Sequence, residues 1–221
     1  MKLYSLPLSP FSARVRGALY AKSLAFEALA PPESFGTSEE FRKLSPMNKI
    51  PLLVRGDGTT LGESSVIVEY LEDAFPEPPL RPESAEALAQ VRFVTQVADG
   101  YVMNVLGPLF LLFDAKEKDT RTITTQLAKL DDGLAKLEAV LTPASYAQGG
   151  RISTADVWLT PIRFSLDGFS AFAARPGLLD RYPRVNGYKD VAQRDPALGR
   201  VWSEMTEGLN AFMKRYAAGK A

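Results

Sequence analysis

Residues 49–65 have the sequence KIPLLVRGDGTTLGESS. Pro51 begins a short apolar run, Gly56-Asp57-Gly58 supplies a turn, and Thr59–Leu61 forms a second short run. An apolar helical face follows at Val66, Ile67, Tyr70 and Leu71. The segment therefore predicts a β-hairpin followed by a helix.

The residues before this segment alternate between strand and helix patterns. A strand is predicted at Lys2–Leu6, a helix through Val15 and Leu19, a strand near Phe26–Leu29 and a short helix near Glu39–Leu44. The resulting order, β-α-β-α-β-β-α, predicts an α/β thioredoxin-like domain with a mixed four-stranded sheet covered by helices on both faces.

The chain changes character after this domain. Residues 75–82 contain four prolines in eight residues, which neither a helix nor a central strand accepts. Helical spacing then dominates, most clearly in a stripe at Ile123, Leu127, Leu130, Leu134, Leu137 and Leu141. We expect a thioredoxin-like domain at 1–76, a linker at 77–84 and an all-α helical bundle domain at 85–221.

Composition excludes several function classes. The sequence has 221 residues, with 26 Lys and Arg against 26 Asp and Glu, so no net charge favours nucleic acid or an anionic membrane. Cysteine and histidine are both absent, which removes disulfides, thiolate or imidazole metal sites, and Ser-His-Asp catalysis. The start has no signal-peptide core, and the longest apolar run, Val105–Phe113, is nine residues long. We expect a cytoplasmic protein with no metal, no nucleic-acid partner and no membrane span.

Ser9 lies between the first predicted strand and the first predicted helix, in Leu8-Ser9-Pro10-Phe11-Ser12. Unpaired amides at the start of a helix favour a negative charge there, so thiolate chemistry is possible beside Ser9. The alternative is a helix cap, with Ser9 at the N-cap and Pro10 at the first helical position.

Two further motifs could bind a peptide-like ligand. A cis bond between Ile50 and Pro51 would fit the strand that follows and would turn the Ile50 backbone toward such a ligand. At Gly62-Glu63-Ser64 a strand ends and a helix starts, so Ser64 could bind a carboxylate and Glu63 an ammonium group. The alternative for this second motif is an ordinary turn with an N-cap.

The order and spacing of these motifs resemble the cytosolic glutathione transferase superfamily across essentially the whole chain. The matching segments are Ser9-Pro-Phe-Ser with Arg14-Val-Arg16, Lys49-Ile50-Pro51 and Glu63-Ser64. Ser153-Thr154-Ala155-Asp156 also looks like the capping box that begins the central C-terminal helix of the family. Zeta-class members carry Ser-Ser-Cys-Ser where this chain has Ser-Pro-Phe-Ser, which is closer to the omega pattern.

The resemblance implies an enzyme that uses an ionised glutathione thiol to attack a small hydrophobic electrophile, with glutathione as co-substrate and Ser9 as the catalytic residue. The reaction would be conjugation, or a related isomerisation, dehalogenation or peroxide reduction. By the same resemblance, Ser64 takes the γ-glutamyl carboxylate, Glu63 the ammonium group and the Ile50 backbone the cysteinyl peptide unit. Lys49 would meet the glycyl carboxylate, or else be an ordinary solvated lysine. The resemblance further implies a homodimer that acts in detoxification. The competing hypothesis is a non-catalytic binding or regulatory protein with the same fold.

The pocket for the second substrate is predicted from apolar side chains. We expect it to use Phe11, which also borders the glutathione site, and residues of the first long helix after the linker: Tyr101, Val102, Leu106, Phe110 and Phe113. The alternative for each is packing in the helical core.

Overall fold

The computed structural model describes residues 1–142 and 145–219, and the chain divides into two compact units. The first unit combines Met1–Leu80 with the C-terminal segment that begins at Pro196, and the second unit is Arg81–Asp195. The sequence grouped 85–221 together, whereas the contacts place the last helix with the first unit. Helical periodicity shows that a helix has an apolar face, but it does not show which part of the chain covers that face.

The first unit contains a mixed four-stranded sheet. The strands run in the order β2-β1-β3-β4, with β1 parallel to β2 and antiparallel to β3, and β3 antiparallel to β4. The predicted thioredoxin-like order is confirmed. The elements are β1 (Lys2–Tyr4), α1 (Pro10–Ala21), β2 (Glu27–Leu29), α2 (Glu39–Leu44), β3 (Leu52–Val54), β4 (Thr60–Gly62), α3 (Ser64–Ala74) and α9 (Pro196–Ala218).

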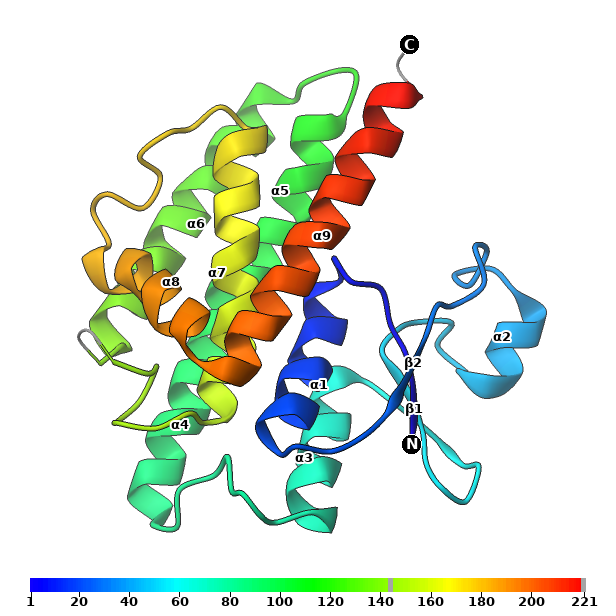
Figure 1. Cartoon of the computed structure of the whole chain (residues 1–221). Coiled ribbons are helices and arrows are strands. Elements are labelled where there is room, and N and C mark those ends of the chain that lie inside the picture. Colours follow the sequence, from blue (N-terminus) through cyan, green and yellow to red (C-terminus); the bar gives the residue numbers. More distant parts are fainter. Residues whose placement is uncertain (143–144, 220–221) are drawn as a thin grey trace. The chain divides into compact units, whose positions relative to one another are not determined.

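Helices cover both faces of this sheet (Figure 1). Helices α1 and α3 pack against each other on one face, and α2 lies on the other. Phe41 is the buried residue of α2, and its ring meets that of Tyr4 on β1 edge to face, with 5.5 Å between centroids. Leu3 and Leu53, which pair across β1 and β3, are fully buried. The sheet is therefore packed on both faces, and the loops start from its strand ends.

A buried ion pair joins α1 to α3. The Lys22 ammonium lies 2.7 Å from a Glu72 carboxylate oxygen, and their side chains are 0% and 4% exposed. Lys22 also donates to the carbonyl oxygens of Phe75 and Pro78, at 2.7 and 3.0 Å. The amide of Leu80 donates to the Glu72 carboxylate. The proline-rich segment is thus fixed to the first unit by charge-assisted hydrogen bonds.

The second unit is entirely helical among the residues described, as predicted. Fully buried Leu130, Leu134 and Leu137 lie on the predicted stripe of α6. The helices are α4 (Ala85–Val97), the π-helical segment η1 (Ala98–Met103), α5 (Asn104–Asp114), α6 (Thr120–Val140), α7 (Thr154–Phe172) and α8 (Pro183–Arg194).

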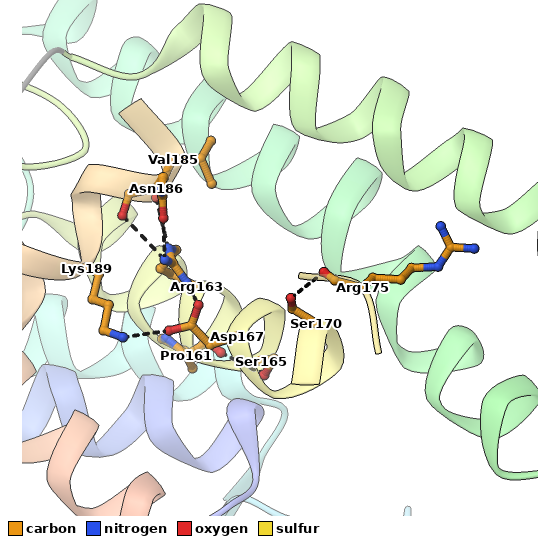
Figure 2. A network of polar contacts seen from close by, with 9 residues as sticks. All are labelled: Pro161, Arg163, Ser165, Asp167, Ser170, Arg175, Val185, Asn186 and Lys189. Carbon is orange, nitrogen blue, oxygen red and sulfur yellow. Dashed lines mark hydrogen bonds and ion pairs between the residues drawn. The ribbon is translucent and has the colours of Figure 1, made fainter. Parts of the chain in front are cut away.

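Polar contacts inside this unit fix α7. The predicted capping box is present: the Asp156 carboxylate accepts from the Ser153 amide at 2.8 Å. Farther along α7, the buried guanidinium of Arg163 forms an ion pair with Asp167 and donates to the Val185 carbonyl and the Asn186 side chain on α8 (Figure 2). The start of α7 and its contact with α8 are therefore each fixed by directional bonds.

The π-helical segment η1 approaches α6 closely. An ideal Cβ on Gly133 of α6 would overlap the Tyr101 carbonyl oxygen and lie 2.8 Å from its carbonyl carbon. Only a glycine permits this approach without movement of the backbone. Gly133 therefore allows η1 to pack against α6.

The helical run Ala85–Asp114 is long and apolar enough to cross a membrane by length and composition. Its most apolar window of 18 residues has a mean hydropathy of 1.3, and 33% of that window is buried. Within the unit, its residues Val94, Val102 and Leu106 are fully buried, and α4 and η1 pack against α6 and α7. The run therefore supplies part of the helical core, as a core helix of similar composition does in other globular proteins.

Candidate active site

Ser9 is the N-cap of α1. Its Oγ accepts a hydrogen bond from the Ser12 amide at 3.2 Å, and Pro10 occupies the first turn of the helix. The cap predicted as an alternative is therefore present. It uses a lone pair of Oγ and leaves the hydroxyl proton available for a second bond. Capping and donation to a thiolate are compatible, because one uses the oxygen as acceptor and the other uses its proton.

The backbone at Ile50 has the predicted geometry. The Ile50–Pro51 bond is cis, and Pro51 directly precedes β3. Ser45 holds the loop before it: the Ser45 hydroxyl donates to the Lys49 carbonyl at 3.1 Å and accepts from the Lys49 amide at 3.3 Å. The Lys49 side chain is exposed, so either predicted role remains open to it.

Glu63 and Ser64 differ from an ordinary serine-capped turn. The N-cap of α3 is Glu63, with no side-chain capping bond, and Ser64 is the first helical residue. Glu63 has φ of 61°, a conformation that favours glycine and costs a glutamate about 1–3 kcal/mol. The Glu63 side chain is exposed and Ser64 is buried at the helix start. Strain of this kind concentrates at ligand-binding positions, which supports a binding role for this turn.

The predicted second-substrate residues lie on both units. In the first unit, Phe11 is 42% exposed, and the Arg14 guanidinium lies 4.8 Å from its ring centroid. In the second unit, Tyr101 is 47% exposed.

The other second-unit residues pack more deeply. Val102 and Leu106 are fully buried, as the core-packing alternative requires. Phe110 is half-buried, with its ring edge to face against Phe169 at 5.3 Å, and Phe113 packs on Phe169 in the same way at 5.4 Å. Phe11, Tyr101, Phe110 and Phe113 are thus the predicted residues that keep accessible surface.

Sequence reasoning missed the contacts around Arg16. The sequence identified Arg16 only as part of the Arg-Val-Arg resemblance, but its guanidinium binds the Leu6 and Pro7 carbonyls and the Glu204 carboxylate. No local pattern could have found Glu204, because it lies 188 residues away along the chain. Among the described residues, no group of three or more acidic, histidine or cysteine side chains could hold a metal ion.

Comparison with known proteins identifies the family. Residues 3–79 match the profile of the glutathione S-transferase N-terminal domain. Glutathione S-transferase 1 of Dianthus caryophyllus is 32% identical over 88% of this chain and 92% of its own length. The chain therefore belongs to the glutathione S-transferase family.

Other relatives are isomerases. The maleylacetoacetate isomerase of Pseudomonas aeruginosa is 29% identical over 89% of this chain and 93% of its own length. A crystal structure of maleylacetoacetate isomerase from Methylobacterium extorquens AM1, with malonate and glutathione bound, has a TM-score of 0.71 at 26% identity and covers 91% of this chain and 95% of that one. The holo structure of a maleylpyruvate isomerase, described as a bacterial glutathione S-transferase of the zeta class, has a TM-score of 0.75 at 25% identity and covers 91% of this chain and 96% of that one. This similarity is to the zeta class, whereas residues 9–12 alone favour the omega pattern. This chain is accordingly a glutathione-dependent transferase or isomerase.

Proposed function

We propose that Ser9 is the catalytic residue of this enzyme and that its hydroxyl donates a hydrogen bond to the glutathione thiolate. The observation that carries the proposal is the Ser9 cap, which leaves the hydroxyl proton free at the positive end of α1. A thiolate bound there attacks the electrophile, and the enzyme contributes by keeping the thiol ionised and oriented.

The energies of these interactions are sufficient. Lowering the pKa of a thiol from about 8.5 to about 6.5 requires about 2.7 kcal/mol. A hydrogen bond to a charged group contributes about 1.5–3 kcal/mol, and a helix N-terminus adds about 0.3–1 kcal/mol. Ser9 and α1 can therefore supply the shift together, without a histidine.

The rest of glutathione is assigned to the neighbouring loops of the first unit. The Ile50 backbone, in the loop that Pro51 ends, pairs with the cysteinyl peptide unit. Ser64 binds the γ-glutamyl carboxylate at the start of α3, and Glu63 binds the ammonium group. Lys49 contacts the glycyl carboxylate. The strained backbone of Glu63 supports this assignment, because it presents an acidic side chain at a position that otherwise favours glycine.

The second substrate is a small hydrophobic electrophile, and within the first unit the accessible ring of Phe11 is the apolar surface assigned to it. Isomerisation is a second candidate reaction, favoured by the relatives named maleylacetoacetate isomerase. In that reaction the thiolate adds to a cis double bond, the new single bond rotates, and the thiolate leaves again. Both reactions need the same activated sulfur, so Ser9 serves either.

The proposal includes a homodimer in the cytoplasm with a role in detoxification. Large apolar side chains are exposed on α3 and α4, where Val66 is 48% and Phe93 is 53% exposed. Burial of such side chains between two copies would stabilise a dimer. Light scattering that gives a mass of 24.2 kDa in solution would contradict it.

The test of the Ser9 role compares two serine caps. Ser9→Ala should lower kcat/KM at neutral pH by about 10-fold or more, because the bound thiol loses about 1.5–3 kcal/mol of stabilisation. Ser84 caps α4 by accepting from the Ala87 amide at 3.1 Å, so Ser84→Ala removes the same kind of cap without touching the site. It should leave turnover unchanged. Equal activity of Ser9→Ala and wild type would refute the role of Ser9.

A further inference from the structure

Helix α9 contacts α1 and the loop that carries Ser9, all within the first unit (Figure 1). Arg200, Glu204 and Gly208 follow one another at intervals of four residues, so they lie on one face of α9. Each of them contacts α1 or the loop before it. Three links join this face of α9 to the turn that carries Ser9: Arg16 of α1, Glu204 and Gly208.

The first link is the guanidinium of Arg16, which is 3% exposed. It donates to the Leu6 carbonyl at 3.1 Å, to the Pro7 carbonyl at 2.7 Å and to the Glu204 carboxylate at 2.7 Å. The Leu6 carbonyl also accepts from the Ser9 amide at 3.1 Å. Arg16 and the backbone of Ser9 therefore share one acceptor, and the position of Arg16 fixes the turn that ends at Ser9.

The second link is the Glu204 carboxylate, which is held by two further donors. The Tyr20 hydroxyl donates to it at 2.5 Å and Arg200 at 3.3 Å. The Arg200 guanidinium also lies 4.0 Å from the ring centroid of Tyr20. Burial, together with the hydrogen bond to Glu204, raises the pKa of Tyr20 to about 12, so the hydroxyl remains a donor at neutral pH. Tyr20 and Arg200 thus orient the Glu204 carboxylate that accepts from Arg16.

The third link is Gly208, where α9 meets the loop itself. An ideal Cβ there would lie 2.9 Å from the Leu8 amide nitrogen, 2.9 Å from the Pro7 Cβ and 3.2 Å from the Pro7 carbonyl carbon. These are backbone and ring atoms, which cannot rotate away. Glycine is disfavoured in a helix interior relative to alanine, so its presence here fits a need for close approach.

We propose that Arg16, Glu204 and Gly208 are positioning residues that hold the Leu6–Ser9 turn in place, so that the Ser9 hydroxyl meets the glutathione sulfur at hydrogen-bonding distance. The inference rests on the proposed role of Ser9. The three residues touch neither glutathione nor the electrophile. They act through the backbone of the turn, and a displacement of about 1 Å is enough to weaken a hydrogen bond and slow a reaction.

The test uses Glu204→Gln and Gly208→Ala. In wild type, Arg16 and Tyr20 each donate to a different oxygen of the Glu204 carboxylate. In Glu204→Gln an amide NH2, which is a donor, replaces one of these oxygens, so Arg16 and Tyr20 compete for the single oxygen that remains. In Gly208→Ala the added methyl displaces the turn. For each, the ionisation of bound glutathione is followed by the ultraviolet absorbance of its thiolate against pH. The apparent pKa of the bound thiol should rise by about one unit, with a fall of about 10-fold in the ionisation constant.

Two matched controls accompany these variants. Gly187 lies in α8 with no atom within 4 Å of an ideal Cβ, so Gly187→Ala adds a helical methyl in open space. Asp132 pairs with Lys136 on the surface of α6, so Asp132→Asn removes a carboxylate that orders no loop. Both should keep the wild-type ionisation profile and the wild-type kcat.

The outcomes separate the two proposals. If Glu204→Gln binds glutathione and shows the wild-type ionisation profile while Ser9→Ala does not, the positioning inference is wrong and the role of Ser9 stands. A lower melting temperature with an unchanged profile would also overturn it, because that is the result of a purely structural role. If Gly208→Ala does not fold, Glu204→Gln decides. If Ser9→Ala itself has the wild-type profile, the proposed function fails first.

Discussion

Replacement of Lys22 by methionine should strongly destabilise the fold. Lys22 is the C-cap residue of α1, and its ammonium lies 2.7 Å from the Glu72 carboxylate with both side chains almost fully buried. Methionine has a similar length and fills the same space without a charge. The variant removes the positive charge that lies beside the buried Glu72 carboxylate, and it removes the donor from the carbonyls of Phe75 and Pro78.

The expected loss is about 3–5 kcal/mol, the usual result of removing one member of a buried ion pair. Total stabilities are about 5–15 kcal/mol, so the loss is a large share of the whole. Glu72→Met alone should cost a similar amount, because it leaves the Lys22 ammonium buried. The double variant removes both charges, and it should be less destabilised than the sum of the single variants by about 2 kcal/mol or more.

Urea unfolding of the four proteins, followed by circular dichroism, measures these differences from the transition midpoints. The matched control is Lys2→Met in the same unit. Lys2 pairs with Glu27 at 3.3 Å, but both side chains are more than half exposed, so this variant should cost less than about 1 kcal/mol. Equal losses for Lys22→Met and Lys2→Met, or additive losses in the Lys22 and Glu72 cycle, would refute the reasoning.

Two further predictions concern the second unit. Gly133→Ala should lower the free energy of unfolding, measured in urea, by about 1–3 kcal/mol, because the added methyl would overlap the Tyr101 backbone. Gly187→Ala should leave this free energy unchanged or raise it. Equal transition midpoints for the two variants would contradict the prediction. Burial raises the pKa of Asp156 from its ordinary value of 3.8 to about 6. Between these two values the folded state binds a proton that the unfolded state does not. The stabilisation that this proton gives is lost as the pH rises from about 4 to about 6. The stability of wild type relative to Asp156→Asn should therefore fall over that interval by up to about 3 kcal/mol, and a constant difference would disprove the shift.

Much of the fold is readable from local pattern. The strand and helix order of the first 74 residues follows from alternation and turn residues, and the stripe of α6 from helical spacing. Ser153 and Asp156 predict a capping box because both partners lie within one helical turn. The cis bond at Pro51 was predicted because proline cannot donate to the ladder of the following strand.

The candidate site was only partly readable in this way. Ser9 was recognised both as a cap and as a possible donor, but the bond from Ser12 that reconciles the two roles comes from the structure. The positive φ of Glu63 depends on how β4 meets α3, and nothing in Gly-Glu-Ser requires it. The accessible and buried members of the aromatic set could not be distinguished, because helical spacing gives the same apolar pattern to a core and to a pocket.

The amino-acid sequence by itself determined the properties that depend on neighbours along the chain: the βαβαββα order, the family, the cap at Ser9 and the exclusion of cysteine and histidine chemistry. Only the tertiary structure decided that α9 belongs with the first unit, that Glu204 meets Arg16, and that Lys22 is buried against Glu72. The physical reason is distance along the chain. Periodicity and capping act over a few residues, whereas Arg16 and Glu204 are 188 residues apart. The residues next to a charged side chain in the sequence do not indicate which distant residue it will pair with.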